Sequence, residues 1–316
     1  MTLKKDTRFL TDKEYYSDDT FLSSSALNNF VTFDALGNPI YNFAEFLNPT
    51  PPDSAELHIG TYCDEVLTNG KNLEDLISKK MSKSELEEEC EMRNIDVAAQ
   101  RKALWYKWVA TIAQLKKLLE DDGMTFNNEV TDAIYTACEK IISRAKNFQY
   151  DFKTSFMQYI AECETQFTMV DDGLGMRGKF DFFNPKRWRI TDLKTTKNLD
   201  RIKKELIFRN EINVYHKYTR QLAIYQRLAY YQTGEFYTCE LAIIDHKWHH
   251  MLIRIGQEAL DLAWAQVEKD IEVLRQYGSK EIVDYAVTLT ATPKPPWTIV
   301  QNILAEEVED EEEQLY

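Results

Sequence analysis

The sequence predicts an α/β fold in which a mixed central β-sheet is flanked by helices and preceded by a helical insertion. Four β-prone runs lie in the second half of the chain, at residues 179–183, 188–193, 238–245 and 249–255. Apolar side chains recur at helical spacing before and after these runs. Strands that alternate with helices are typical of a sheet covered by helical layers. The 316 residues are 44% apolar, which is ample for one large domain or two modest ones.

The N-terminal part, residues 1–72, contains two segments that predict helices. A serine run at 23–25 precedes the first one, and a serine hydroxyl accepts hydrogen bonds from the free amides of a first helical turn. The second segment runs from Gly60 to Leu67 and carries Asp64.

Residues 73–150 form the predicted helical insertion. Two apolar stripes keep helical spacing there, and the region of Gly123 separates them. Such stripes indicate packing between helices rather than a binding site. They consist of Leu104, Trp108, Ile112, Leu115 and Leu119, and of Val130, Ile134, Ile141 and Ala145.

Residues 151–292 are predicted to form the core of the domain, and a β-hairpin lies near their start. Its two runs flank a turn at residues 184–187. If Phe183 pairs with Trp188, Asp181 lies opposite Ile190 and diagonal to Asp192. A later helix carries Leu260, Ala263, Val267, Ile271 and Leu274 on one side.

The hairpin places three charged side chains on one face of the sheet. Side chains alternate with period two, so Asp181, Asp192 and Lys194 share that face. Diagonal neighbours lie roughly 7–8 Å apart, so both carboxylates can reach one divalent cation or a pair of cations about 3.5–4 Å apart. Alternating Asp and Lys residues are also common as solvated charge, so the hairpin alone leaves both interpretations open.

Three segments resemble PD-(D/E)xK nucleases of the RecB-like group. Asp192 to Thr195 resembles their Asp-x-Lys-Thr segment. Gly178 to Asp181 resembles their Gly-x-x-Asp motif, with phenylalanine at position 180 where proline is usual. Gln221 and Tyr225 resemble their Gln-x-x-x-Tyr helix, and residues four apart share one helix face.

The N-terminal part is similar to phage and prophage exonucleases related to exonuclease VIII, the RecE-like group. Residues 15–27 resemble the opening segment of that group, and residues 60–67 resemble its Gly-Thr-x-x-His helix. Asp64 stands where the metal-ligating histidine would be. A carboxylate is a competent ligand for Mg²⁺ or Mn²⁺, although Asp64 can equally be an ordinary acidic helix residue. The resemblance extends from about residue 15 to about residue 278.

The resemblance implies a restriction-endonuclease-like core and roles for the site residues. Asp181 and Asp192 would ligate one or two Mg²⁺ or Mn²⁺ ions, with the Leu193 carbonyl as a further ligand. Lys194 would orient or activate the attacking water, and the metal would stabilise the developing charge. Gln221 and Tyr225 would orient a carboxylate or contact a DNA phosphate. Glu164, on the first strand of the sheet, would approach the metal, although Glu162 shares its face and a simple surface edge explains both.

The charge distribution favours DNA near this site despite the net charge of −14. Residues 177–220 contain thirteen Lys or Arg and five Asp or Glu, a local excess of +8. The rest of the chain contains 25 Lys or Arg and 47 Asp or Glu, a net charge of −22. Basic surfaces favour a polyanion. We expect about half of ten basic residues in this segment to contact DNA, although a solvated helix face explains some of them. The ten are Lys186, Arg187, Arg189, Lys197, Arg201, Lys203, Lys204, Arg209, Lys217 and Arg220.

Cysteine and histidine usage predicts neither an iron–sulfur cluster nor a zinc site. The five cysteines are scattered without a Cys-x-x-Cys motif, unlike the clustered cysteines of some RecB-like relatives. His246, His249 and His250 have no cysteine or acidic partner at zinc-ligand spacing, so we predict a turn with solvent-facing histidines. Free thiols without a signal peptide or a long apolar span predict a cytoplasmic protein that does not contact membranes.

These features together predict a Mg²⁺-dependent exonuclease that acts on the ends of linear duplex DNA. The resemblance implies a role in phage recombination or replication in the host cytoplasm, beside a single-strand annealing protein and as a ring-shaped homo-oligomer. Two alternatives stay open, a catalytically inactive nuclease fold that serves as a DNA-binding scaffold and a structure-specific endonuclease. Residues 293–316 are predicted to be a linker and an acidic disordered tail.

Overall fold

In the part of the chain that the structure describes, the main sheet is mixed and has six strands. The computed structural model describes residues 14–15, 21–34, 36–47, 49, 54–95, 97, 102–104, 107–109, 111–124 and 126–277. The strands are β1 (Leu22–Ser23), β6 (Glu164–Asp171), β7 (Met176–Asn184), β8 (Arg189–Thr196), β11 (Thr238–Asp245) and β12 (His250–Ile255). Antiparallel β6 borders one edge of β7. Parallel β1 and antiparallel β8 share the other edge, and β8 continues to parallel β11 and then antiparallel β12. The predicted fold class is confirmed.

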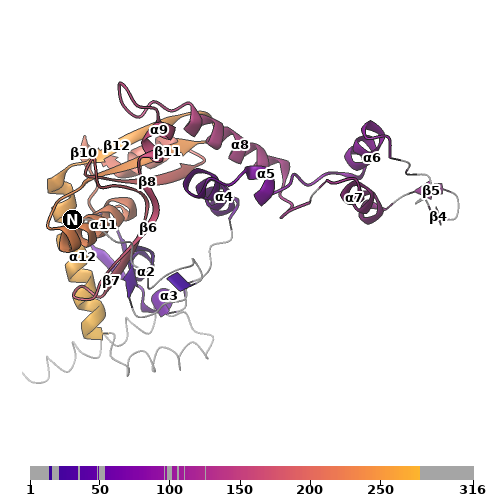
Figure 1. Cartoon of the computed structure of the whole chain (residues 1–316). Helices are drawn as coiled ribbons and strands as arrows, with labels where there is room; N and C mark the ends of the chain where they lie inside the picture. Colours follow the sequence, from indigo (N-terminus) through magenta and orange to yellow (C-terminus); the bar gives the residue numbers. More distant parts are fainter. Residues whose placement is uncertain are drawn as a thin grey trace, which may run out of the picture.

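Helices cover both faces of this sheet (Figure 1). On one face, the first core joins the sheet to α2 (Ser24–Phe30), α10 (Leu199–Leu206), α11 (Lys217–Thr233) and α12 (Gln257–Tyr277). On the other face, the second core joins it to α4 (Ala55–Asn69), α8 (Asp132–Lys146) and α9 (Phe156–Ala161). Shorter elements connect them: β2 (Val31–Phe33), β3 (Pro39–Tyr41), α3 (Phe43–Leu47), α5 (Leu73–Leu76), β9 (Ile207–Phe208) and β10 (Glu211–Ile212).

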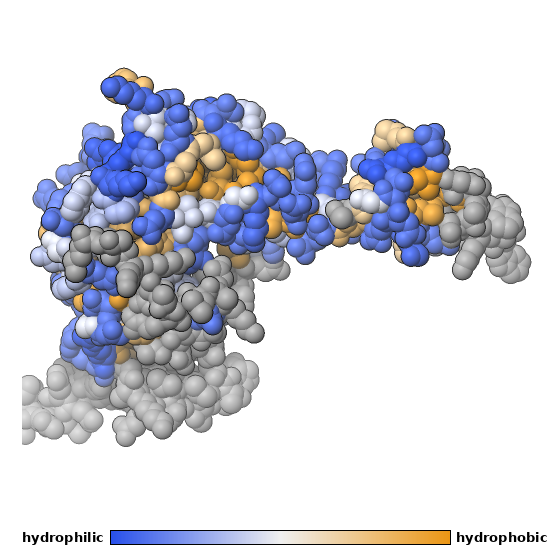
Figure 2. Space-filling model, viewed as in Figure 1, coloured by the Kyte–Doolittle hydropathy of each residue, from blue (hydrophilic) through white to orange (hydrophobic). Residues whose placement is uncertain are grey.

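A helical arm extends away from the sheet in Figure 1. Its helices α6 (Lys83–Met92) and α7 (Ile112–Asp121) bury Leu86, Cys90, Leu115 and Leu119 in a small core of their own. Figure 2 shows the apolar residues gathered where the two helices face each other. α8 instead packs into the second core beside α4, although it falls within the predicted insertion. The boundaries that we predict at residues 72 and 150 stay predictions.

The helical prediction for Leu104 and Trp108 is wrong. These residues belong to β4 (Lys102–Leu104) and β5 (Lys107–Val109), which pair as an antiparallel hairpin. The segment is rich in aromatic residues, which favour strands over helices. The remaining apolar stripes are confirmed as α7 and α8, except that Val130 precedes α8 and forms a β-bridge with Lys79. The helix from Leu260 to Leu274 is also confirmed and is α12.

The predicted helix starts and strands of the main body are also confirmed. The Ser23 hydroxyl accepts a hydrogen bond from the Ala26 amide at 3.1 Å and so caps α2. β11 and β12 occupy the two predicted strand segments of the second half. The segment after residue 292, including the acidic run, lies outside the described residues.

The register of the β7–β8 hairpin differs by two residues from the predicted one. Phe183 pairs with Ile190 rather than with Trp188, and continuing that register places Asp181 directly across from Asp192. Residues 185–188 all belong to the turn, where Trp188 adopts a left-handed backbone with φ of 56°. A shift of two residues keeps the paired side chains of residues 182–184 and 189–191 on their predicted faces. In this register the two aspartates are direct rather than diagonal neighbours.

β7 and β8 separate at Asp181 and form a fork. β7 pairs with β8 at residues 182–184 and with β1 at residues 176–177. β1 and β8 lie along the same edge of β7. Between them, residues 178–181 have no strand partner on that edge in the described part of the chain. Side-chain alternation is also interrupted here, because Phe180 and Phe183 both lie in the first core while Phe182 lies in the second. The interruption leaves Asp181 at the seam between the two cores.

Gly178 permits α11 to approach this fork closely. A Cβ atom at this position would lie 2.8 Å from Leu228 Cδ1, 2.9 Å from Phe180 Cε1 and 3.0 Å from Tyr225 Cδ1. We expect Gly178→Ala to lower the free energy of unfolding by about 1–3 kcal/mol, because overpacking displaces these side chains. Chemical denaturation would measure the loss. Gly256→Ala is the matched control, since a Cβ atom there meets nothing within 4 Å. Equal effects of the two substitutions would contradict the explanation.

Candidate active site

Two aspartates and a lysine converge where β7 and β8 separate. Asp181 Oδ2 accepts a hydrogen bond from the Leu193 amide at 2.8 Å, which bridges the gap between the strands. On β8, Asp192 is only 1% exposed, and its Oδ2 lies 2.6 Å from Lys194 Nζ. The structure therefore brings together Asp181, Asp192 and Lys194, as the sequence predicts.

Asp192 is a buried carboxylate with a single close partner among the described residues. That partner is the Lys194 ammonium at 2.6 Å, and no backbone amide or neutral side chain of the described ranges donates to either oxygen. A buried carboxylate with so few partners is costly unless it also serves a ligand. The Leu193 carbonyl faces the same gap, because the N–H and C=O groups of one strand residue point to the same side. The carboxylates of Asp181 and Asp192 and the Leu193 carbonyl therefore all lie at the gap between the two strands.

The ionisation of the site reflects crowding of like charges. Burial raises the pKa of Asp64 to about 6; Lys179 and Lys194 oppose this rise and Asp192 adds to it. Burial, followed by repulsion from Asp192 and Asp64, raises the pKa of Asp181 well above its usual value. A bound cation would relieve this repulsion.

Lys194 stays protonated at neutral pH. Burial alone would lower its pKa, but attraction to Asp192 and Asp181 outweighs burial and raises the pKa above its usual value. The ammonium also lies 5.2 Å from the centre of the Tyr218 ring. Lys194 can therefore act as a fixed cation that holds a water molecule or a phosphate oxygen.

Asp64 and Gln166 extend the site from two further elements. Asp64 projects from α4, and its carboxylate accepts hydrogen bonds from Gln166 Nε2 at 3.3 and 3.1 Å. The register of β6 and β7 places Gln166 across from Asp181, and its backbone adopts a left-handed φ of 48°. Such backbone in a strand is strained for a residue other than glycine, and strain of this kind clusters at functional sites. Gln166 is a site residue that sequence reasoning missed, since one polar residue in a strand gives no signal.

α11 contributes one face to the site. Gln221 Nε2 donates a hydrogen bond to Tyr225 Oη at 2.8 Å, so the predicted pair does share a helix face. Burial raises the pKa of Tyr225 well above its usual value, and the charges of Asp192 and Asp181 raise it further. Tyr218 precedes Gln221 by three residues and covers Lys194. It was also missed, although the helical spacing of positions 218, 221 and 225 could have indicated it.

The structure does not bring Glu164 to the carboxylates. Glu164 is exposed at the start of β6 and pairs with Phe183, which lies two positions beyond Asp181 on β7. Glu162 lies outside the strand, where it contacts Arg187 at 2.7 Å. The prediction of a metal-proximal glutamate is wrong here, because the strand carries Gln166 rather than a glutamate opposite Asp181.

Most of the predicted basic residues form two separate groups at opposite ends of β8, while Arg209 and Lys217 are exposed farther along the chain. Arg187 and Arg189, near the hairpin turn with Lys186, already pair with the acidic residues Asp151, Glu162 and Glu240. The second group follows the carboxyl end of β8 on and beside α10. It contains Lys197, Arg201, Lys203 and Lys204, which are all exposed. Eight residues of strand separate the groups by roughly 26 Å, and the second group lies at the end of β8 towards which the fork opens.

Arg220 does not lie on a DNA-facing surface, so that prediction is wrong. Its side chain is 1% exposed, and its NH2 group contacts Asp270 Oδ2 at 2.7 Å. The guanidinium also lies 5.0 Å from the centre of the Phe33 ring. The residue joins α11 to α12 inside the first core, because a buried arginine requires a buried carboxylate.

The three histidines of the β11–β12 turn have different surroundings. His249 Nδ1 lies 3.0 Å from Asp245 Oδ2, which corrects the expectation that no acidic partner is near. Arg144 Nε donates to His250 Nδ1 at 3.0 Å. His246 instead lines a hollow beside the carboxyl end of β8. Among the described residues, no group of three or more His, Cys, Asp or Glu side chains forms a ready-made metal cluster.

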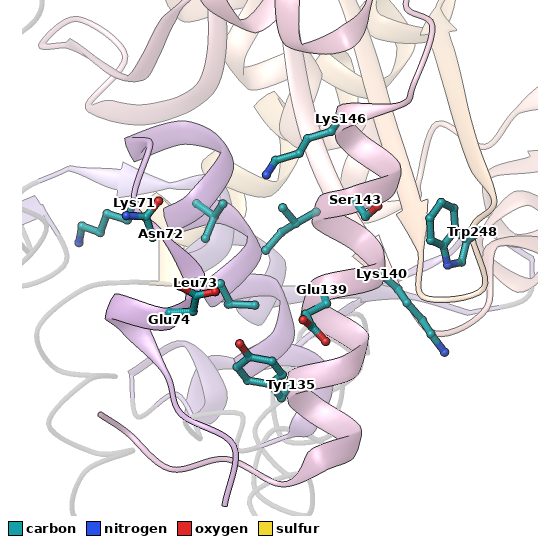
Figure 3. A pocket seen from close by; sticks show the side chains of 12 residues that line it. Lys71, Asn72, Leu73, Glu74, Tyr135, Glu139, Lys140, Ser143, Lys146 and Trp248 are labelled. Carbon is teal, nitrogen blue, oxygen red and sulfur yellow. The ribbon is translucent and has the colours of Figure 1, made fainter. Parts of the chain in front are cut away.

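A larger hollow of about 550 Å³ lies between α4, α5 and α8, near Trp248. Figure 3 shows its lysines, and Lys71 and Lys140 point in opposite directions. Lys71 also contacts Glu65 at 2.7 Å. The hollow therefore lacks converging charged groups, in contrast to the fork.

A mixed sheet that carries two aspartates and a lysine where its central hairpin separates defines a PD-(D/E)xK-like fold. Residues 42–283 match the PDDEXK-like domain of unknown function (DUF3799), and the chain belongs to that family. A crystal structure from Eubacterium rectale, described as "Putative exonuclease", has a similar fold with a TM-score of 0.52 and 19% identity, over 85% of this chain and 86% of that chain. At this identity the likeness shows the fold alone. No curated protein matches the chain.

None of the helices in the described ranges has both the length and the apolar character that crossing a membrane requires.

Proposed function

We propose that this protein is a metal-dependent deoxyribonuclease that degrades linear DNA from its ends. The observation that carries the proposal is Asp192, a buried carboxylate whose one close partner among the described residues is Lys194 at 2.6 Å, and which lies across the fork from Asp181. A purely structural role does not explain why two neighbouring carboxylates share one ammonium. The PD-(D/E)xK-like fold, which usually uses a divalent metal, supports the same conclusion.

The fork fits a small, hard cation. Asp181, Asp192 and the Leu193 carbonyl supply oxygen atoms, and Asp64 can add another from α4. Mg²⁺ keeps several water ligands and needs only one or two carboxylates, so the absence of a three-carboxylate cluster among the described residues is compatible with it. A divalent ion held there would stabilise negative charge on the phosphate under attack.

The side chains around the fork have distinct tasks in this proposal. Lys194 holds a water molecule or a phosphate oxygen as a permanent cation. The aromatic ring of Tyr218 covers the Lys194 ammonium and so holds it next to Asp192. Gln221 and Tyr225 limit where the carboxylates can move. Lys197 and Arg201, with their neighbours on α10, attract the strand that leaves the fork.

The preference for DNA ends is supported by the resemblance of the N-terminal segments to the exonuclease VIII group. The protein from Eubacterium rectale that is described as "Putative exonuclease" supports it further. A ring-shaped oligomer, a single-strand annealing partner and action in the cytoplasm of a host cell complete the proposal. Asp64 in place of a histidine favours a second candidate, a nuclease fold that binds DNA without cutting it.

A nuclease assay with Mg²⁺ would test the proposal on linear and on covalently closed duplex DNA. We expect progressive loss of the linear molecule and an intact closed circle. Rapid cutting of the circle would instead identify an endonuclease. No cleavage of either DNA, together with no calorimetric binding of Mn²⁺ when DNA is present, would favour the non-catalytic scaffold.

The carboxylate cluster predicts an unusual pH dependence of stability in the metal-free protein. Asp64 and Asp181 have raised native pKa values, so the folded state binds more protons than the unfolded state above about pH 4. Their contribution to stability is therefore largest below pH 4 and is lost as the pH rises, for Asp64 through about 6. Screening by solvent reduces the Asp64 effect to on the order of 1–2 kcal/mol.

Thermal unfolding between pH 4 and pH 8 would measure this dependence. Asp64→Asn is the informative variant, because it removes the charge and keeps the shape. We expect the variant to gain stability relative to the wild type as the pH rises, and Mg²⁺ to stabilise the wild type more at pH 8 than at pH 5. If the stability of the wild type and that of Asp64→Asn changed with pH in the same way, the result would contradict the crowding of charges at the fork.

A further inference from the structure

A small, mostly apolar hollow lies outside the carboxyl ends of β8 and β11, beside the fork. Its volume is about 310 Å³. Its apolar wall comes from α4 and α8 and consists of Ala55, Ile59, Ala133, Ile134, Ala137 and Ile141. Its polar lining comes mostly from the ends of β8 and β11, and two polar residues belong to the helix side: Thr195, Thr196, Lys197 and His246, with Glu56 and Thr131. Ligands of open α/β sheets bind outside the carboxyl ends of strands, which is where this hollow lies.

The hollow and the carboxylate site share one helix and one strand. α4 packs closely on β8, since a Cβ atom at Gly60 would lie 3.2 Å from Thr195 Oγ1. Asp64 lies one turn beyond Gly60, whereas Ile59 immediately precedes Gly60. A rise of 1.5 Å per residue separates Ile59 from Asp64 by about 7.5 Å along the helix. On β8, Thr195 directly follows Lys194.

We propose that this hollow receives an unpaired nucleobase of the DNA strand whose phosphate lies at the fork. The inference rests on the proposed nuclease function and adds the class of substrate. A base has two apolar faces and a polar edge, which matches apolar walls from α4 and α8 with polar groups concentrated at the strand ends. The volume lies at the lower end of the range for small-molecule pockets. His246 provides a ring that can stack on a base.

The charges at the rim suit the phosphates that flank such a base. Lys197 lines the hollow and contacts Glu56 Oε1 at 3.3 Å, but both side chains are largely exposed, at 71% and 50%. An exposed ion pair is weak. A phosphate can therefore replace Glu56 as the partner of Lys197, and Arg201 follows one turn later on α10.

A base can enter a side hollow only after it leaves the duplex. The enzyme must then act on a single strand or on the frayed end of a duplex, because unstacking a paired base costs free energy. A recessed or frayed end would be cut faster than a fully paired blunt end.

Calorimetric titration of the full chain with dAMP and with 2-deoxyribose 5-phosphate, in the presence of Mg²⁺, would test the hollow without any catalysis. We expect dAMP to bind about tenfold more tightly than 2-deoxyribose 5-phosphate, because its base can stack in the hollow and the sugar phosphate has no base. Ala133→Met should abolish this difference, because Ala133 is an exposed wall residue and methionine would fill the hollow. Ala265→Met, on the exposed surface of α12, is the matched control and should keep the difference.

Three results would overturn the proposal: equal binding of the two compounds, no binding of either, or an unchanged preference in Ala133→Met. Each of them is read from binding alone. Failure of the nuclease proposal would instead appear as the absence of Mg²⁺-dependent cleavage in the wild type. Should Ala133→Met fold poorly, His246→Ala should reduce the preference for dAMP, and an unchanged preference in that variant would likewise contradict the assignment.

Discussion

Asp192→Asn is expected to abolish Mg²⁺-dependent DNA degradation, with a fall in rate of at least about 10³-fold. The substitution keeps the size and shape of the side chain and removes its charge. An amide is a poor substitute for a carboxylate as a ligand of Mg²⁺, and it cannot hold the Lys194 ammonium by charge. Both functions of Asp192 at the fork would therefore be lost together.

The fold should tolerate this substitution. The attraction between Asp192 and Lys194 at 2.6 Å would be lost, but the repulsion that Asp192 exerts on Asp181 and Asp64 would be lost as well. The one close contact of Asp192 with a described residue is that with Lys194, and an asparagine oxygen can still accept a hydrogen bond from the ammonium. We expect the free energy of unfolding to change by less than about 1 kcal/mol, given how closely these opposing terms match.

End-labelled linear DNA would measure the rate, and thermal unfolding would report on the fold. Asp200→Asn, at an exposed position of α10, is the matched control and should retain full activity. Activity in Asp192→Asn near that of the control would remove the main support for a catalytic fork. Loss of activity together with a large loss of stability would mean that Asp192 serves the fold instead.

The sequence predicted the chemistry of the fork better than its geometry. The strand alternation of Ile190, Asp192 and Lys194 was enough to place the last two on one face, and β8 keeps that alternation. The register could not be derived, because it depends on where the turn lies. The turn has four residues as predicted, but it occupies residues 185–188 instead of 184–187, and Trp188 adopts there a left-handed backbone that aromatic residues seldom take.

Contacts between residues far apart in the chain explain the other differences. Gln166 became part of the site because it binds Asp64, which lies 102 residues earlier. Arg220 is buried because Asp270, 50 residues later, pairs with it. A charge count along the sequence cannot distinguish such a buried arginine from the exposed Lys197 or Arg201. Local pattern therefore identifies the strands and the charged site, whereas tertiary contacts decide which charges reach solvent.

Arg220→Met is expected to destabilise the fold by about 3–5 kcal/mol, because it leaves Asp270 buried without its cation. Tyr41 Oη and Gln266 Nε2 would still donate to Asp270 Oδ1, at 3.1 and 2.9 Å. These neutral donors compensate only part of a buried charge. Burial already raises the pKa of Asp270, against the attraction of Arg220, so removal of Arg220 should raise it further.

Chemical denaturation at pH 8 and at pH 5.5 would measure the loss. A native pKa that exceeds the unfolded value makes stability decrease as the pH rises, so the variant should lose more stability at pH 8. The double variant Arg220→Met with Asp270→Leu should regain much of the loss, because an apolar pair has no charge to desolvate.

Activity distinguishes this structural role from a DNA contact. Below its unfolding temperature, Arg220→Met should bind and cut DNA as the wild type does, whereas Arg201→Met, on the exposed face of α10, should bind DNA more weakly with a reduced salt dependence. A stable Arg220→Met protein with weakened DNA binding would contradict the structure. The comparison thus separates the arginine that stabilises the domain from the arginine that we expect to meet the substrate.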